Sequence, residues 1–257
     1  MEISFQGKTV LITGGASGIG FASAAAFSQH GANVVLIDVN EAALAERASA
    51  IRAEGGEALG LICDVRHYDE VAATCRKAHE KYGRIDILVN CAGGTAKRLL
   101  NHPEDLLDTP MAVLDFGIDL NLKGPMYFGI EAMKYMKEQK SGVILNFGSV
   151  TGEEGDKWGL DYAVSKAGVM GGLTKSLALY GAEHGVRCCC ISPGPIMTRP
   201  AMAGMTTLLR HAGQPEDIVS MVLYLCSDYG KFITGTNYFI DGGRVICPDK
   251  TWGKNDV

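Results

Sequence analysis

The sequence predicts an α/β protein with a doubly wound parallel sheet that helices cover on both faces. Short apolar runs rich in β-branched residues alternate with amphipathic segments along the chain, as in repeated β-α units. The apolar runs are nearly continuous, which is typical of strands buried on both faces. A glycine-rich turn, TGGASGIG at residues 13–20, joins the first run to the first amphipathic segment. Together these observations predict a Rossmann-like sheet with a ligand site at its carboxyl edge.

Length and composition are those of a globular protein. The 257 residues are 47% apolar and 21% charged, and no linker, repeat or charge block divides them, so we expect one domain over residues 1–257. The net charge of -5, with scattered Lys and Arg, argues against nucleic acid or a membrane surface as a partner. No export signal begins the chain, and no apolar run approaches the ~18 residues of a membrane span. We therefore expect a cytoplasmic protein.

The eight cysteines and six histidines predict no metal site. No CxxC pair occurs, and Cys188, Cys189 and Cys190 are consecutive within an apolar run. Alternation along a strand would send the middle one to the opposite face, so the three cannot close on one ion. The histidines also lack ligand spacing. We expect reduced thiols in the core and no bound metal.

Seven segments have the composition of strands, and the segments between them have helical periodicity. Glycines end the first strand and the helix after the second, and Pro215 with its neighbouring acids marks the start of the last helix. The segment 111–140 contains Asn121, Gly124 and Pro125, so we expect a bent helix or one with a special contact there. The strands are expected at 8–13, 32–38, 58–65, 85–94, 142–149, 185–196 and 236–243. The helices are expected at 21–30, 41–55, 69–82, 111–140, 160–182 and 215–228.

The glycine-rich turn and the second strand indicate a dinucleotide site. A strand, a glycine turn and a helix start aim backbone N–H groups at a phosphate, and the glycines allow close backbone approach. The second strand ends in Asp38, whose carboxylate can accept hydrogen bonds from ribose hydroxyls and would repel a 2′-phosphate. Neither Val39 nor Asn40 supplies a cation for that phosphate. The cofactor is therefore expected to be NAD, with Asp64 beyond the third strand reaching the adenine amine.

The segment SVTGEEGDKWGLDYAVSK, residues 149–166, carries the candidate chemistry. Tyr162 and Lys166 are four residues apart in a helical pattern, so both side chains leave the same face. The pKa of a free phenol is about 10, and a fixed cation nearby favours the phenolate. Ser149 ends the apolar run VILNFGS, at the carboxyl end of a strand where α/β sheets bind ligands. We expect Tyr162 to act as general acid/base, with Ser149 aligning the substrate oxygen.

Taken together, the chain resembles the compact, single-domain branch of the short-chain dehydrogenase/reductase family. The match extends over nearly the whole chain, and the order and spacing of its short motifs make it specific. The motifs are TGGASGIG at 13–20, Asp38, Asp64, NCAG at 90–93, Asn121, Ser149, YAVSK at 162–166, PGPIMT at 193–198, GQPEDI at 213–218 and DGG at 241–243.

This resemblance implies a sheet of about seven strands and hydride exchange between a nicotinamide and an alcohol or carbonyl carbon. It implies that Asn121 holds a water in the proton relay, and that Lys166 lowers the pKa of Tyr162 and binds the nicotinamide ribose. The cofactor-binding residues that it implies are Gly14, Ser17, Gly18, Ile19, Gly20, Asp38, Asp64, Val65, Asn90, Ala92, Gly93, Tyr162, Lys166, Pro193, Gly194, Ile196 and Thr198.

The substrate side departs from the family pattern. The segment 198–210 is shorter than the usual lid, and the loop 95–110 is longer than usual, so we expect this insertion to take over part of the lid's work. Polar residues lie in the loop and before Tyr162, and a polar secondary alcohol, such as a sugar, polyol or hydroxy acid, is favoured if they face the pocket. These residues are Lys97, Arg98, Asn101, His102, Glu153, Glu154, Asp156, Lys157 and Trp158.

Three other functions remain open. A 3-oxoacyl thioester reductase is the alternative within the family, although Asp38 argues against the NADPH that such reductases mostly use. A hydroxysteroid dehydrogenase is another, and a cofactor-binding regulator without turnover is the non-enzyme alternative. The resemblance also implies a homotetramer, with the helices at 111–140 and 160–182 as the shared interface.

Overall fold

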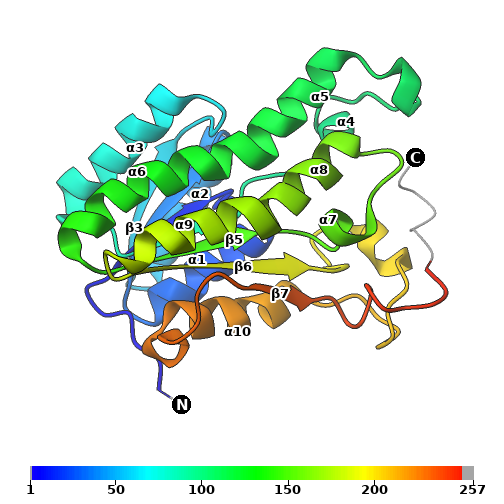
Figure 1. Cartoon of the computed structure of the whole chain (residues 1–257). Coiled ribbons are helices and arrows are strands. Elements are labelled where there is room, and N and C mark those ends of the chain that lie inside the picture. The colour runs from blue at the N-terminus through cyan, green and yellow to red at the C-terminus, as the bar shows by residue number, and fades with distance from the viewer. Residues whose placement is uncertain (1, 251–257) are drawn as a thin grey trace.

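The computed structural model describes residues 2–250. Its centre is one seven-stranded sheet in the order β3-β2-β1-β4-β5-β6-β7, and every neighbouring pair is parallel. The predicted fold class is therefore confirmed. Figure 1 shows the sheet between two layers of helices. The strands are β1 Thr9–Thr13, β2 Asn33–Asp38, β3 Glu57–Ile62, β4 Ile87–Asn90, β5 Gly142–Phe147, β6 Val186–Pro193 and β7 Asn237–Ile240.

Each face of the sheet has its own apolar core, because successive side chains of a strand point to opposite faces. Val10 and Ile12 of β1 pack in one core, and Leu11 packs in the other. Cys189 likewise lies in the first core and Cys188 in the second, so the expected alternation of the cysteines is confirmed. The first core is covered by α1 Gly18–Gln29, α2 Glu41–Ala53 and α10 Pro215–Cys226, and the second by α3 Tyr68–Tyr82, α6 Gly124–Gln139 and α9 Thr174–Ala182.

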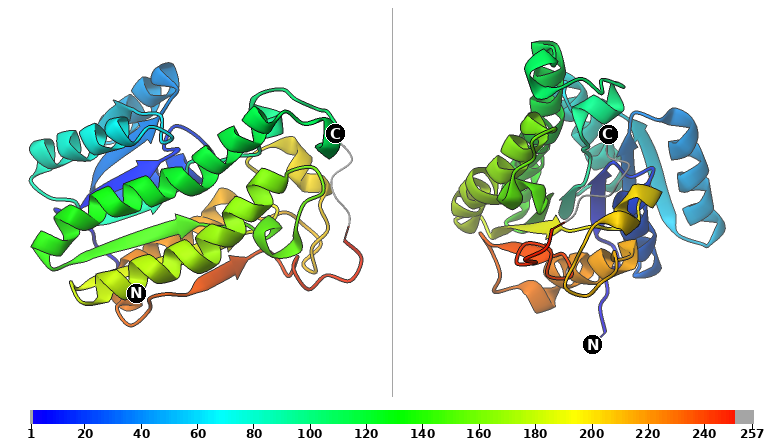
Figure 2. Two further views of the ribbon diagram at one scale, coloured as in Figure 1. Left: turned by 45° about the horizontal axis from the view of Figure 1, so that its top comes forward. Right: turned by 90° about the vertical axis from the view of Figure 1, so that its right-hand side faces the viewer.

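The two long predicted helices each contain a π-helical segment. The first consists of α5 Met111–Ile118, the π segment η2 Asp119–Lys123 and α6. The second consists of α8 Leu160–Gly168, the π segment η3 Val169–Leu173 and α9. Asn121 lies within η2, so the expected special contact in this helix coincides with the widened turn, a feature frequent at functional sites. The views in Figure 2 show these two long helices running side by side.

The carboxyl ends of the central strands form one edge of the sheet. Thr13 at the end of β1 pairs with Ile37 of β2 and with Asn90 of β4, so the loops after these strands start at one level. The strands β3 to β7 each end two to four residues before their predicted ends, and Ser149 therefore lies just beyond β5. Within the described residues, five short helices lie in the loops: α4 Ala96–Leu99, η1 Leu106–Asp108, α7 Thr151–Glu154, η4 Pro200–Gly204 and η5 Asp228–Gly230.

No helix within residues 2–250 is long and apolar enough to cross a membrane.

Candidate active site

A large pocket opens at the carboxyl edge of the sheet. Its volume of about 1570 Å³ exceeds that of a typical small-ligand site of about 300–1,000 Å³, and leaves room for a dinucleotide with a substrate. Most of the predicted cofactor residues lie in its wall. They are Gly14, Ser17, Gly18, Ile19, Gly20, Asp38, Asp64, Val65, Ala92, Gly93, Tyr162, Lys166, Pro193, Gly194, Ile196 and Thr198.

The glycine turn lies against the loop after β4 and against its own helix start. Gly14 has a φ of +66°, and a Cβ there would lie 3.0 Å from the Ala92 backbone. A Cβ on Gly20 would lie 2.1 Å from the carbonyl oxygen of Gly14. Both positions therefore require glycine. This packing brings the N-terminus of α1, which begins at Gly18, to the pocket wall, where its free N–H groups suit a pyrophosphate.

Substitution of Gly20 by Ala should damage this turn. Because the added methyl would meet a backbone atom rather than a flexible side chain, we expect Gly20→Ala to lower the free energy of unfolding by about 3 kcal/mol, the upper end for overpacking, and to weaken NADH binding. Denaturant titration and NADH titration measure the two effects. The control is Gly60→Ala, whose Cβ would have no neighbour closer than 3.7 Å. Equal stability of the two variants would contradict the proposed constraint.

Asp38 lies in the pocket wall at the end of β2. Its carboxylate accepts a hydrogen bond from the Asn40 N–H at 3.1 Å and a longer one from the Ala16 N–H at 3.3 Å. The second bond ties the carboxylate to the glycine turn, so that both line the same part of the pocket. Val39 is 64% exposed and lines the same region, and it adds no charge.

Asp64 also lies in the pocket wall, but its carboxylate accepts hydrogen bonds from Arg66. The Arg66 Nε lies 2.9 Å and 3.0 Å from the two carboxylate oxygens, and the guanidinium stacks on the Phe116 ring at 4.2 Å. The hydrogen bonds from Arg66 lower the pKa of Asp64, so it stays ionised at neutral pH. Contact of this carboxylate with an adenine amine remains a prediction, and it would use lone pairs that Arg66 leaves.

Asn90 and Asn121, unlike the other predicted residues, are not in the pocket wall. The Asn90 Nδ2 donates to the Pro125 carbonyl and to Asn146, between β4 and α6. Asn121 is fully buried, and its side chain exchanges two hydrogen bonds of 2.9 Å with the Gly94 backbone. The Asn121 side chain thus holds the turn after β4, whereas the Asn90 side chain joins β4 to α6 and β5. Gly93 of the turn faces the pocket.

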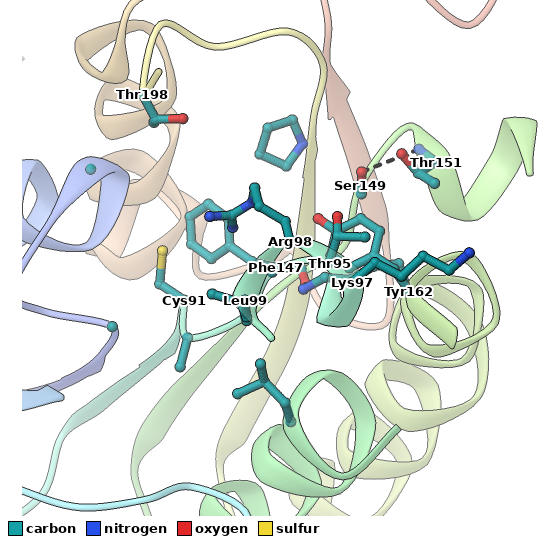
Figure 3. Close-up of a pocket in the computed structure, with 18 of the residues that line it drawn as sticks. Cys91, Thr95, Lys97, Arg98, Leu99, Phe147, Ser149, Thr151, Tyr162 and Thr198 are labelled. Atoms are coloured by element: carbon teal, nitrogen blue, oxygen red, sulfur yellow. Dashed lines mark hydrogen bonds between the residues drawn. The ribbon is translucent and has the colours of Figure 1, made fainter. Parts of the chain in front are cut away.

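Ser149, Tyr162 and Lys166 all line the pocket, and Figure 3 shows Ser149 and Tyr162 there. The Lys166 Nζ lies 5.6 Å from the centroid of the Tyr162 ring, as their spacing on α8 predicts. Lys166 is only 4% exposed, and its Nζ donates a hydrogen bond of 2.7 Å to the Phe147 carbonyl at the end of β5. The Ser149 Oγ accepts a hydrogen bond of 3.1 Å from the Thr151 N–H. A hydroxyl, a phenol and a fixed ammonium therefore line the same pocket, and such a set can hold an oxygen and move its proton.

The insertion and the segment before Tyr162 form the outer wall. Every polar residue singled out in them lines the pocket except Glu153, which borders a shallow hollow beside β7. The 95–110 loop thus contributes residues 95, 97–99 and 101–104 to the pocket wall. The short 198–210 segment contributes Thr198, Arg199, Met202 and Met205.

Several wall and supporting residues are not evident from the sequence. Arg244 is fully buried; its Nε lies 3.2 Å from both carboxylate oxygens of Glu154, and its Nη1 donates to the Thr206 carbonyl. Arg244 thereby joins α7 to the 198–210 segment.

Two other residues of this kind are Cys91 and Asp161. Cys91 has a thiol in the pocket wall, and burial raises the pKa of this thiol to about 12. Asp161 lies next to Tyr162 in the chain, and burial raises the pKa of its carboxyl group. A Cβ on Gly117 would fall 1.7 Å from the Asp161 Oδ2. Their contacts are between distant segments, and no local motif signals them.

Comparison with known proteins identifies relatives that match most of the chain. A family model described as Enoyl-(Acyl carrier protein) reductase matches residues 14–244. The chain is 36% identical over 250 residues to 3-oxoacyl-(acyl-carrier-protein) reductase FabG of Thermotoga maritima, covering 94% of this chain and 99% of the relative.

Two solved structures share the fold closely. A 7α-hydroxysteroid dehydrogenase in complex with NADH and 7-oxo glycochenodeoxycholic acid superposes with a TM-score of 0.87 at 31% identity, covering 96% of this chain and 98% of that one. An NAD⁺-bound xylitol dehydrogenase has a TM-score of 0.84 at 27% identity, covering 93% and 99%.

Proposed function

The chain belongs to the short-chain dehydrogenase/reductase family, and we propose that it is an NAD-dependent enzyme that oxidises a polar secondary alcohol or reduces the corresponding ketone. As a member of this family it is an oxidoreductase acting on CH–OH groups. The observation that carries the proposal is the convergence of Ser149, Tyr162 and Lys166 in a pocket whose other half holds the glycine turn and Asp38.

In this proposal the protein positions the alcohol and moves its proton, and bound NAD accepts the hydride. Ser149 donates a hydrogen bond to the substrate oxygen. Tyr162, as phenolate, takes the hydroxyl proton, and the fixed charge of Lys166 stabilises the negative phenol oxygen. With NAD bound, the carbinol carbon would lose its hydride to the cofactor, and the overall conversion would be of alcohol and NAD⁺ to ketone, NADH and a proton. The amide side chain of Asn121 already forms hydrogen bonds with the Gly94 backbone. A water of the proton relay that this residue holds would therefore bind to its main chain.

Asp38 supports NAD over NADP. Its carboxylate lies where the second strand of a βαβ unit meets the adenosine ribose, and no cation follows it at Val39 or Asn40. A 2′-phosphate would therefore meet a negative charge without compensation. The complexes of the hydroxysteroid and xylitol dehydrogenases hold NADH and NAD⁺, in line with this proposal.

A 3-oxoacyl thioester reductase is the second candidate. The relative of that name from Thermotoga maritima, at 36% identity, favours it, whereas the charged wall around Lys97, Arg98 and Trp158 favours a small polar substrate.

The test of the proposed function is NADH formation at mildly alkaline pH. The panel contains polyols, sugars, hydroxy acids, steroids and simple secondary alcohols, with NAD and NADP assayed in parallel. We expect turnover with NAD on the polar alcohols. Activity with NADP alone would contradict the cofactor assignment, and NAD binding without turnover on any alcohol would favour a regulator.

We also propose that the enzyme is a homotetramer joined through α6 and the α8–α9 helix. Large apolar side chains are exposed on these helices, including Val164 at 53%, Leu179 at 76% and Ile130 at 43%, and such a surface favours burial against a second copy. Sedimentation equilibrium measures the mass of the assembly, and a monomer would overturn this proposal.

A further inference from the structure

Lys97 places a buried positive charge in the wall of the substrate end of the pocket. It belongs to α4 in the insertion and is only 8% exposed. Its Nζ donates a hydrogen bond of 2.7 Å to the Glu104 carbonyl and lies 5.9 Å from the centroid of the Trp158 ring. Within the described part of the chain, no carboxylate forms an ion pair with it. An ammonium has three N–H donors, so its charge and most of its donors are available to a ligand.

The nearby acids in the wall have other partners. The carboxylate of Glu104 lies 3.3 Å from the His102 ring nitrogen, and Asp156 accepts a hydrogen bond of 2.9 Å from the Trp158 N–H. The Glu154 carboxylate is held by Arg244 and by Lys250, at 3.2 Å and 2.9 Å. None of these acids forms an ion pair with Lys97, so the Lys97 ammonium has no paired counter-ion in this part of the wall.

Two more residues with cationic side chains line the same pocket. Arg98 also lines the pocket, and in Figure 3 its side chain extends toward Cys91, whereas that of Lys97 extends past Tyr162. The Lys157 ammonium lies 5.0 Å from the Trp158 ring. These cations therefore line the same pocket as Tyr162.

A buried ammonium without a counter-ion costs free energy, because desolvation is not offset by a paired charge. An anion that enters the pocket supplies this charge and accepts short, charge-assisted hydrogen bonds. If the only role of Lys97 were its hydrogen bond to the Glu104 carbonyl, its substitution would lower the stability of the fold and leave the choice of substrate unchanged.

Building on the proposed function, we propose that Lys97 binds a carboxylate of the substrate, which makes the substrates hydroxy acids. The reacting hydroxyl lies at Ser149 and Tyr162, and the carboxylate points toward the insertion. The insertion is then a specificity element that selects the acid over neutral alcohols of the same shape.

The experiment compares each acid with its amide, which has nearly the same shape without the charge. The probes are β-hydroxybutyrate, γ-hydroxyvalerate and their primary amides, assayed for NAD reduction with the wild type, Lys97→Met and Lys97→Arg. We expect Lys97→Met to lower kcat/KM for the acids about 10- to 100-fold, mainly through KM, with the amides unchanged. Lys97→Arg should retain most of the activity on the acids. Lys77→Met, an exposed lysine on α3, should match the wild type, and denaturant titration of each variant reports any loss of stability.

Two results would overturn the inference while leaving the proposed function intact: equal kcat/KM of acids and amides in the wild type, or an equal loss on both in Lys97→Met. If no alcohol reduces NAD, the proposed function fails, and the subsite is then tested by equilibrium binding of the acids and amides to the NADH complex through tryptophan fluorescence. Tighter binding of the acid that Lys97→Met abolishes supports the subsite. Equal binding of acid and amide contradicts it.

Discussion

Replacement of Tyr162 by Phe is expected to lower kcat by about 10²- to 10⁴-fold, the usual contribution of a positioned general acid/base. Phe fills the same space on α8 but cannot take or give the proton. Lys166 keeps its hydrogen bond to the Phe147 carbonyl, and the glycine turn is unchanged, so NADH should bind with nearly the same affinity. Steady-state kinetics and NADH titration separate the two effects.

The matched control for this variant is Tyr229→Phe, which removes the hydroxyl of a tyrosine that is 47% exposed and lies outside the pocket wall. It should retain full activity. A Tyr162→Phe enzyme with more than about a tenth of the wild-type kcat would mean that another group carries the proton, because loss of a general acid/base costs at least about 10²-fold.

Substitution of Asp38 is expected to have the second large effect, on the choice of cofactor. The variant Asp38→Ala with Val39→Arg removes the carboxylate and adds a cation next to it. Loss of charged hydrogen bonds to the ribose should lower kcat/KM with NAD about 10- to 100-fold, and kcat/KM with NADP should rise. The ratio of kcat/KM for NAD to that for NADP should therefore fall by at least about 10²-fold.

Glu41→Gln serves as the control for the cofactor experiment, since it neutralises an exposed acid three residues further along the chain, in the first turn of α2. It should keep the wild-type preference. A double variant at 38 and 39 that still prefers NAD by the wild-type ratio would show that the discrimination lies elsewhere in the pocket.

The parts of the site that follow from local pattern could be predicted from the sequence. A spacing of four on a helix fixes the common face of Tyr162 and Lys166, and the end of an apolar strand places Ser149 at the sheet edge. Continuous apolar strands predict burial on both faces, and the alternation of Cys188 and Cys189 follows from strand geometry alone.

The direction of a side chain that packs against a distant segment could not be predicted. A motif gives the position of Asn90 and Asn121 in the chain, but their amides bond to Pro125 and Gly94, which only the folded chain brings near. Likewise, the Arg66 guanidinium that bonds to the Asp64 carboxylate stacks on the ring of Phe116, which is distant in the chain. The π segments add one residue to a turn within an otherwise regular periodicity, a change that leaves no clear signal in the sequence.

The most direct test of hydride transfer at this site follows deuterium from the cofactor to the product. NADH that carries deuterium on the transferable position of its nicotinamide is incubated with a mixed panel of ketones and oxo acids, and the alcohols formed are analysed by mass spectrometry. With the wild type, we predict at least one product that carries deuterium on its carbinol carbon, and none above background with Tyr162→Phe. The absence of labelled alcohol with a wild-type enzyme that binds NADH, or equal labelling by both enzymes, would contradict the account.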